Sequence, residues 1–288
     1  MKWLKKLSDA IDYIEDHLDK DISYDEAAKI ACCSIYYFQR MFSYVAGISL
    51  SEYIRRRRMT QAAFVLQSTD VKVLDVALRY GYNSPTSFNR AFQSIHGISP
   101  VGARNSGNVL NAYLPIKFSV QVTGGSSMSY RIKEKEAMRI VGIRIPITED
   151  MEKNQKNVPT FWNSTVQSDQ YYQICGLSNK APDGILGITV YQSPKEIYYY
   201  ICAASDRPAP AGMFEYEIPA ATWVIFESDG HFKETVQSTF RRFLTEWLPF
   251  SRYIYAELPD IEVYPINPNI PQSGHSEVWI AIKKEKEN

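Results

Sequence analysis

Apolar positions in the first hundred residues recur with the period of an α-helix. The first series spaces its side chains by three or four residues: Leu4, Leu7, Ile11, Ile14 and Leu18. We therefore predict an amphipathic helix over residues 4–18. Ser23 and Glu26 have the spacing of a capping box, which predicts a second helix that ends near Ala31. Residues 50–66, which contain four consecutive arginines, predict a longer helix.

The stretch 75–100 is typical of a helix-turn-helix unit. A short helix is followed by a turn at Gly81, and Ser84 with Pro85 begins a second helix. Ser is a preferred cap at a helix N-terminus, and Pro suits the first helical position because no donor is needed there. Such a pair of helices is a common means of reading DNA.

The same pattern occurs fifty residues earlier. Nine positions match without a gap: Asp25 with Asp75, Ala27 with Ala77, Ser34 with Ser84, Phe38 with Phe88, Arg40 with Arg90, Phe42 with Phe92, and Gly47-Ile48-Ser49 with Gly97-Ile98-Ser99. Similarity at a fixed period indicates a structural repeat. We therefore predict two helix-turn-helix units joined by the helix at 50–66. That helix would be about 25 Å long, which suits two recognition helices separated by one DNA turn of about 34 Å.

From Met128 onward, apolar residues alternate with polar ones in short runs, which is typical of β-strands. The predicted strands cover residues 130–132, 139–146, 185–191, 196–203, 213–218, 222–227, 261–264 and 277–282. Helices are predicted from Pro159 and from His231 to Leu248. The order strand-strand-helix-strand-strand thus occurs twice. We expect two half-domains side by side, with their sheets facing a shared groove.

These patterns predict a multi-domain chain of 288 residues. An all-α tandem helix-turn-helix domain is expected over residues 1–106 and a Gly- and Ser-containing linker over 107–127. An α+β domain of two strand-strand-helix-strand-strand halves is expected over 128–288. Each domain is long enough to bury its own core.

Charge and cysteine content narrow the possible functions. The whole chain is balanced, with 32 basic and 32 acidic residues, but residues 29–104 hold ten Lys or Arg against three Asp or Glu, a net +7. A local basic excess suits phosphate binding, and a solvated face is the alternative. The four cysteines lack metal-site spacing, so we predict no metal and no cofactor. No signal peptide or apolar membrane span is visible, so we expect a cytoplasmic protein.

Two motifs carry a family resemblance. The first is FQRMF at 38–42, followed by GIS at 47–49. The second is GYNSPTSFNRAF at 81–92, closed by GISP at 97–100. On these motifs, residues 8–104 resemble the DNA-binding domain of AraC-type (AraC/XylS) transcription regulators.

The resemblance implies that both recognition helices enter successive major grooves of double-stranded DNA. By position, the contacting residues are Tyr36, Tyr37, Gln39 and Arg40 in the first helix, and Thr86, Ser87, Asn89 and Arg90 in the second. Gln and Asn can bond adenine edges, and Arg can bond guanine or phosphate. The two tyrosines could instead pack against neighbouring side chains. We expect the first helix to contribute more to base readout than the second.

The arginine run in the connecting helix has two readings. Four successive helical positions point around the whole axis, so we expect one or two of the arginines to contact phosphate, namely Arg55 and Arg58. Glu52 and Arg56 are four residues apart and are expected to form a structural ion pair.

A second resemblance covers residues 128–284. The matching segments are FEYEIP at 214–219, TWVIFESDG at 222–230, FLTEWLP at 243–249, IEVY at 261–264 and EVWIAI at 277–282. They resemble the GyrI-like effector-binding domain. The resemblance implies a small molecule, in many cases a lipophilic cation, bound between the halves, with Glu277 facing it.

Aromatic residues are expected to line that ligand site. We selected Trp162, Tyr191, Trp223, Tyr264 and Trp279. Aromatic faces combined with a carboxylate suit a cation. A structural alternative stays open, because tyrosines are ordinary strand residues and Glu277 could be a solvated glutamate at a strand edge.

Together the patterns predict a ligand-responsive, sequence-specific transcription regulator, with RNA polymerase as a further candidate partner. Two alternatives concern the C-terminal domain, which could be a small-molecule hydrolase or a protein-contact module without a ligand. No set of nucleophile, base and orienting group is visible in the sequence. We therefore predict no catalytic residues and no enzyme.

Overall fold

The chain forms two compact units, Met1–Ser119 and Val120–Asn288. The computed structural model describes residues 2–105, 107–118, 127–148, 150–193, 195–267 and 273–284. Of the predicted Gly/Ser stretch at 123–127, all but the last residue lies outside the described residues. No helix in the described ranges is long and apolar enough to cross a membrane.

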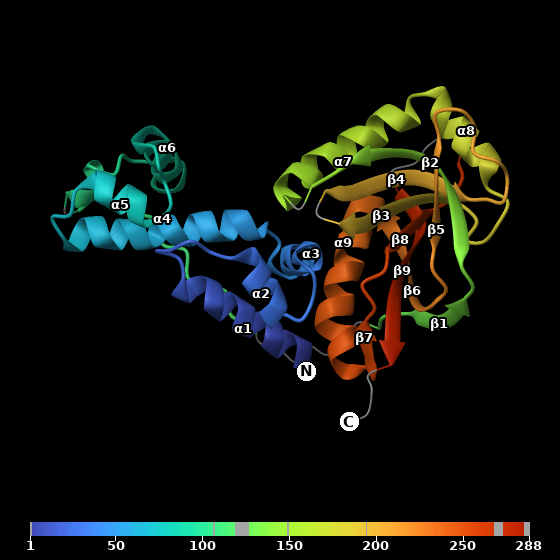
Figure 1. The fold of residues 1–288 in the computed structure, drawn as a ribbon, viewed down its shortest axis with the longest axis horizontal. Helices are drawn as coiled ribbons and strands as arrows, with labels where there is room; N and C mark the ends of the chain where they lie inside the picture. Colours follow the sequence, from blue (N-terminus) through green and yellow to red (C-terminus); the bar gives the residue numbers. More distant parts are fainter. Residues whose placement is uncertain are drawn as a thin grey trace. The chain divides into compact units, whose positions relative to one another are not determined.

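The described part of the first unit is helical (Figure 1). Its elements are α1 (Lys2–Asp16), α2 (Tyr24–Ile30), α3 (Ile35–Ala46), α4 (Leu50–Ser68), α5 (Val73–Arg79), α6 (Pro85–His96) and a 3₁₀ turn (Gly102–Arg104). The predicted helix-turn-helix pairs are confirmed as α2–α3 and α5–α6, and α4 connects them.

Short polar residues and glycines define where these helices begin and end. The hydroxyls of Ser34, Ser49 and Ser84 each accept a hydrogen bond from the backbone N–H three residues further on. Each bond satisfies one of the donors that the first helical turn leaves open. Gly47 and Gly97 end α3 and α6 with φ of 73° and 75°, a left-handed conformation that glycine adopts at low cost.

Helix α4 takes part in two separate cores. Leu50 in its first turn packs in a cluster with Phe38 of α3. Leu66 near its end packs in a second cluster with Phe88 of α6. All four side chains are at most 1% exposed. The fifty-residue repeat in the sequence is therefore a repeat of small cores along one shared helix.

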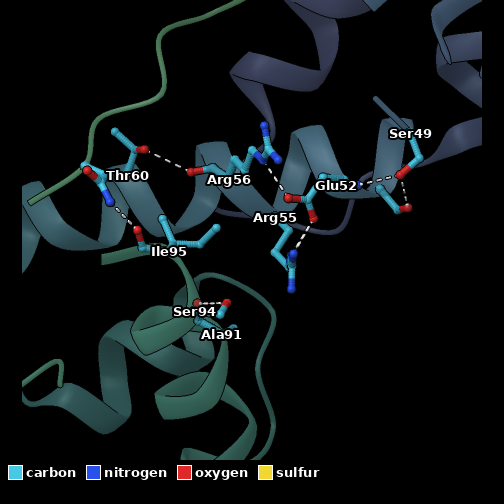
Figure 2. A network of polar contacts seen from close by, with 10 residues as sticks. Ser49, Glu52, Arg55, Arg56, Thr60, Ala91, Ser94 and Ile95 are labelled. Carbon is cyan, nitrogen blue, oxygen red and sulfur yellow. Dashed lines mark hydrogen bonds and ion pairs between the residues drawn. The ribbon is translucent and has the colours of Figure 1, made fainter. Parts of the chain in front are cut away.

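Residues 107–118, which we expected to be linker, pack against the first unit instead. Asn111 Nδ2 donates to the carbonyl oxygen of Ile95 at 2.6 Å, and the Tyr113 N–H donates to Thr60 Oγ1 at 3.0 Å. Figure 2 marks the bond that Ile95 of α6 accepts. Polar groups of the segment thus find protein partners, and the first unit extends past the predicted boundary at residue 106.

The second unit combines strands and helices. Its elements are β1 (Tyr130–Lys135), β2 (Met138–Pro146), α7 (Met151–Val166), α8 (Asp169–Leu177), β3 (Ile185–Ser193), β4 (Glu196–Ala204), β5 (Phe214–Ile218), β6 (Ala221–His231), α9 (Phe232–Arg242), a π-helical turn (Phe243–Trp247), a 3₁₀ turn (Leu248–Phe250), β7 (Tyr253–Tyr255), β8 (Ile261–Tyr264) and β9 (Ser273–Lys284). All eight predicted strands are confirmed, with ends that differ by several residues in places.

Three features of this unit differ from the prediction. Helix α7 begins at Met151 rather than near Pro159, because Asp150 Oδ1 accepts from the N–H groups of Glu152 and Lys153 and so caps the helix earlier. Helix α8 and strand β7 were not predicted. They have nine and three residues, which is too short for a periodic pattern to be distinctive.

The strands of the second unit form one antiparallel sheet, in the order β1-β6-β9-β8-β3-β4-β2-β5, with β7 paired to β9. The two sides of the sheet are related by their strand order, counted from the central pair β3 and β8. One side runs β3, β4, β2, β5, and the other runs β8, β9, β6, β1. The first strand of each half therefore pairs with the other half. The expectation of two sheets facing a groove is wrong, since the halves join edge to edge through β3 and β8.

Alternation along the strands gives this sheet two different faces. One face carries a buried apolar cluster that includes Trp223 and Trp279. On the opposite face, Trp162 of α7 donates from Nε1 to the Tyr199 hydroxyl of β4 at 2.9 Å. We call this second side, on which residues such as Tyr199 lie, the helix-covered face.

Candidate functional site

The start of α6 presents the side chains expected for a recognition helix. Thr86, Ser87 and Arg90 are exposed and Asn89 is half-buried, whereas Phe88 between them is fully buried. Pro85 at the first position and the capping hydroxyl of Ser84 hold the turn that precedes them. A polar, accessible first turn on a helix held by an aromatic core is suited to the DNA major groove.

The corresponding side chains of α3 are buried, and their contact with DNA stays a prediction. Tyr36, Tyr37, Gln39 and Arg40 are 2–7% exposed. The Arg40 guanidinium lies over the ring of Tyr44, 5.5 Å from its centroid, and donates to the Tyr44 hydroxyl at 3.3 Å. The rings of Tyr36 and Tyr37 meet edge to face at 5.3 Å. Packing between tyrosines, which the sequence left open, is therefore present on this helix.

Glu52 holds two of the four consecutive arginines (Figure 2). Arg56 Nε donates to Glu52 Oε1 at 2.6 Å, which confirms the predicted ion pair. Arg55 Nε donates to the second oxygen at 2.7 Å. The Arg55 side chain remains 43% exposed, so its guanidinium stays accessible to a phosphate group.

The other two arginines serve the fold. Arg57 is 4% exposed and donates from Nη2 to Glu15 Oε2 of α1 at 2.7 Å. Arg58, which we expected to contact phosphate, donates instead to the carbonyl oxygens of Leu18 at 2.9 Å and Lys20 at 2.7 Å. These carbonyl groups follow the end of α1, where helical partners are absent. Two nitrogens of Arg58 thus have acceptors within the protein, and its contact with phosphate stays a prediction.

Glu277 already has partners within the protein. Arg131 of β1 donates from Nη2 to Glu277 Oε1 at 2.5 Å, and Trp279 Nε1 donates to Oε2 at 2.6 Å. Arg131 also pairs with Glu227, which lies directly opposite Glu277 on β6. Like charges opposite each other on neighbouring strands repel. The arginine between them therefore gives Glu277 a structural role.

The five aromatic residues selected for the ligand site are divided between the two faces. Trp223 and Trp279 are 0% and 3% exposed and lie together in the core, with ring centroids 6.3 Å apart. Trp162 and Tyr264 meet on the helix-covered face, with centroids 5.3 Å apart. Tyr191 near the end of β3 is half-buried. Residues on opposite faces cannot line one site, so the selected set is wrong as a group.

A different carboxylate lies among aromatic groups on the helix-covered face. Glu262 of β8 is half-buried, and its Oε2 accepts from the hydroxyls of Tyr199 and Tyr264, each at 3.0 Å. Trp162 of α7 donates to the same Tyr199 hydroxyl. Phe232 of α9 packs edge-on against the Tyr264 ring at 5.1 Å. We call these five residues the Glu262 cluster.

Both halves of the second unit contribute to the Glu262 cluster. Gly187 of β3 lies directly opposite Glu262, at the pair of strands where the halves join. A Cβ atom at position 187 would lie 2.7 Å from Glu262 Oε2, 3.3 Å from Trp162 Cζ2 and closer still to the Tyr199 hydroxyl. The missing side chain of Gly187 therefore provides the space that the carboxylate and the rings occupy.

A helix-turn-helix domain model matches residues 27–106. The regulatory protein SoxS of Escherichia coli K12 is 38% identical over 93 residues, which are 32% of this chain and 87% of SoxS. The transcriptional activator AarP of Providencia stuartii is 39% identical over 94 residues, 33% of this chain and 70% of AarP. The TetD protein of transposon Tn10 in Escherichia coli is equally similar, at 39% over 94 residues, 33% of this chain and 68% of TetD.

The second unit is matched separately. A model described as a GyrI-like small molecule binding domain covers residues 128–283, more than half of the chain. The chain belongs to the AraC-type regulators and carries a GyrI-like domain. Among solved structures, SAV2435 bound to tetraphenylphosphonium shares 19% identity, with 54% of this regulator and 94% of that chain covered and a TM-score of 0.48.

Sequence reasoning missed Glu262 although its signal was present. The segment IEVY at 261–264 alternates, so Glu262 and Tyr264 must share one face of β8. In this AraC-type regulator, Glu262 and Tyr264 thus have the same acidic-aromatic spacing as Glu277 and Trp279. Sequence could not show that Gly187, Tyr199 and Trp162 lie beside the first pair.

Proposed function

We propose that this AraC-type regulator binds its operator through both helix-turn-helix units and is controlled by a lipophilic cation bound at the Glu262 cluster. The observation that carries the ligand proposal is the Glu262 carboxylate, held by the hydroxyls of Tyr199 and Tyr264 beside the indole of Trp162.

The chemistry of the Glu262 cluster favours a cation with an apolar body. A carboxylate that is half-buried beneath aromatic rings attracts a positive charge more strongly than one in bulk water, because the surrounding dielectric is lower. The ring faces of Trp162 and Tyr264 add cation–π attraction, at about 0.5–2 kcal/mol each depending on desolvation. Apolar substituents on the cation would gain further from leaving water.

The DNA proposal rests on the exposed first turn of α6 and on Arg55 of α4. Arg90 of α6 is exposed and can bond a guanine edge, and Thr86 and Ser87 lie on the same first turn. Arg55 lies on the connecting helix with an accessible guanidinium, which suits a phosphate contact that fixes register. For α3, the equivalent role of Tyr36, Tyr37, Gln39 and Arg40 stays a proposal from the fifty-residue repeat.

Two arginine substitutions should weaken DNA binding in different ways. Arg90→Ala should cost about 1–3 kcal/mol on a selected operator and relax specificity at one base pair. Arg55→Ala should weaken binding to all sequences alike and lower the salt slope by about one. Fluorescence anisotropy at several salt concentrations measures both effects. Lys233→Ala, an exposed position in the second unit, is the control, and operator affinity that is unchanged in both arginine variants would contradict the docking.

Ligand control should appear as a change in operator affinity when a lipophilic cation is added. Tetraphenylarsonium and tetraphenylborate, a cation and an anion of the same shape, provide a matched pair of probes. We expect the cation to change the operator dissociation constant by at least about fivefold, which is the lower range of allosteric coupling. If the cation binds without changing operator affinity, the proposal that a ligand controls DNA binding is rejected. If the cation does not bind, the proposal that the second unit binds a lipophilic cation is rejected.

A further inference from the structure

A pocket of about 690 Å³ lies in the second unit, away from the Glu262 cluster. It is formed by the edge strand β1, the π-helical turn and 3₁₀ turn after α9, strand β7 and the end of β9. The lining residues are Tyr130, Ile132, Glu246, Trp247, Phe250, Ser251, Arg252, Tyr253 and Lys284. Its volume is within the range of pockets that hold small molecules, and it shares no residue with the Glu262 cluster.

Aromatic rings give this pocket a flat, apolar surface. Trp247 stacks on Tyr253 with ring centroids 5.9 Å apart and an interplanar angle of 25°. The rings of Tyr130 and Trp247 are nearly perpendicular, with centroids 5.4 Å apart. Phe250 is 69% exposed, so its ring is accessible to a ligand in the pocket.

The backbone at this pocket departs from a regular helix. Residues Phe243–Trp247 form a π-helical turn at the end of α9. Such turns are rare and occur frequently at functional sites, because the extra residue per turn redirects the side chains that follow. Here the turn contains Trp247, whose indole also stacks on Phe243 at 5.8 Å and 23°. Its ring neighbours hold the indole in place where it lines the pocket.

The charges around the pocket are predominantly positive. Arg252 and Lys284 are exposed, and within the described ranges neither makes an ion pair with a carboxylate. The single acidic side chain of the lining, Glu246, accepts from Arg242 Nε at 2.8 Å. That bond compensates the glutamate charge, so Arg252 and Lys284 give the pocket lining a net positive charge.

We propose that this pocket binds a flat aromatic anion, such as an aromatic carboxylate or sulfonate. The ring system of the ligand would pack against Phe250 and the part of Trp247 that lines the pocket, and the acidic group would pair with Arg252 and Lys284. Guanidinium and ammonium groups both donate to such oxygens. The proposal does not depend on a ligand at the Glu262 cluster, which has the opposite charge and accommodates the opposite class of molecule.

Matched naphthalene probes on the full-length protein test the proposal. Naphthalene-2-sulfonate should bind at least about tenfold more tightly than naphthalen-2-ylmethylammonium by isothermal titration calorimetry, because only the anion complements the two cations. The double variant Arg252→Gln/Lys284→Gln should lower the affinity for the sulfonate by about tenfold or more. Trp247→Phe should reduce the quenching of tryptophan fluorescence that the sulfonate causes and should keep the preference for the anion.

Two control variants separate this pocket from general charge effects and from the other site. Lys233→Gln/Arg241→Gln removes two exposed cations of α9 that do not line the pocket, and it should leave sulfonate affinity unchanged. Glu262→Gln should also leave it unchanged. Equal affinity for the two probes, no binding of either probe, or an equal loss in the control and in the Arg252/Lys284 variant would each overturn the proposal.

Discussion

Replacing Glu262 with Gln should weaken the binding of tetraphenylarsonium by about 10- to 100-fold, or about 1.4–2.8 kcal/mol. Two unit charges 4 Å apart attract by about 1 kcal/mol in bulk water and about 4 kcal/mol at an effective dielectric constant of 20. A half-buried carboxylate lies between these limits. The substitution keeps the shape and removes the charge, so the hydroxyls of Tyr199 and Tyr264 keep an acceptor.

The matched control is Glu277→Gln. Glu277 is paired with Arg131 and bonded by Trp279 on the opposite face of the sheet, so its neutral analogue should keep the affinity for the cation. Gly187→Ala provides a steric test, because its methyl group would enter the space beside Glu262 Oε2. It should reduce binding of the cation without changing any charge.

Equilibrium dialysis of the cation with the three variants measures these differences. A loss in Glu277→Gln as large as the loss in Glu262→Gln would restore the expectation drawn from the sequence. Unchanged affinity in Glu262→Gln would exclude the cluster as the binding site. The isosteric tetraphenylborate should not lose affinity in Glu262→Gln, since removal of a negative charge cannot weaken the binding of an anion electrostatically.

Replacing Arg57 with Ala should lower the free energy of unfolding of the first unit by about 3–5 kcal/mol, as for other buried ion pairs that lose one partner. The Arg57 and Glu15 side chains are 5% and 16% exposed. Arg57 also donates from Nη1 to the Tyr113 carbonyl oxygen. Among the described residues, removal of the guanidinium would leave the Glu15 carboxylate with the Tyr53 hydroxyl, which donates to it at 2.6 Å.

Tyr53 cannot replace the lost positive charge. Burial, together with the hydrogen bond to Glu15, raises the pKa of Tyr53 above its ordinary value, so the hydroxyl remains a neutral donor at physiological pH. A reduction of 3–5 kcal/mol is large for a unit whose whole stability is of the order of 5–15 kcal/mol.

Amide hydrogen exchange in peptides from α1 and α4 reports the stability of the first unit separately from the second. Arg57→Ala should accelerate exchange in both helices. Arg55→Ala removes a neighbouring arginine from an exposed ion pair and should change stability by at most about 1 kcal/mol. Similar exchange rates in the two variants would show that the buried Arg57–Glu15 pair contributes no more to the stability of the first unit than the Arg55–Glu52 pair does.

Much of the first unit could be predicted because its pattern is local. Helix periods, the capping residues Ser34 and Ser84, and the glycines at 47 and 97 act over a few residues. The contacts of the four consecutive arginines were harder to predict. Sequence showed that Arg55–Arg58 point around a helix but not that α1 and its following loop supply acceptors for the last two.

In the second unit, the positions of the strands could be predicted from the sequence, but the pairing between strands could not. A strand is visible in a sequence as alternation, whereas pairing joins residues far apart in the chain, such as Gly187 with Glu262. The exchange of β1 and β5 between halves leaves no local trace. Two glutamates in apolar strands therefore looked alike in sequence, and Glu277 was selected over Glu262.

The sequence by itself determined the two-domain order, the tandem helix-turn-helix units, the eight main strands and the family, because each follows from short-range periodicity or from contiguous motifs. Only the tertiary structure decided which charged side chains are already partnered inside the protein. It assigned Arg57 and Glu277 to ion pairs and brought Glu262 beside Trp162 and two tyrosines. The reason is physical: the energy of a charge depends on its distance to partners and on its burial, and both are set by segments remote in sequence.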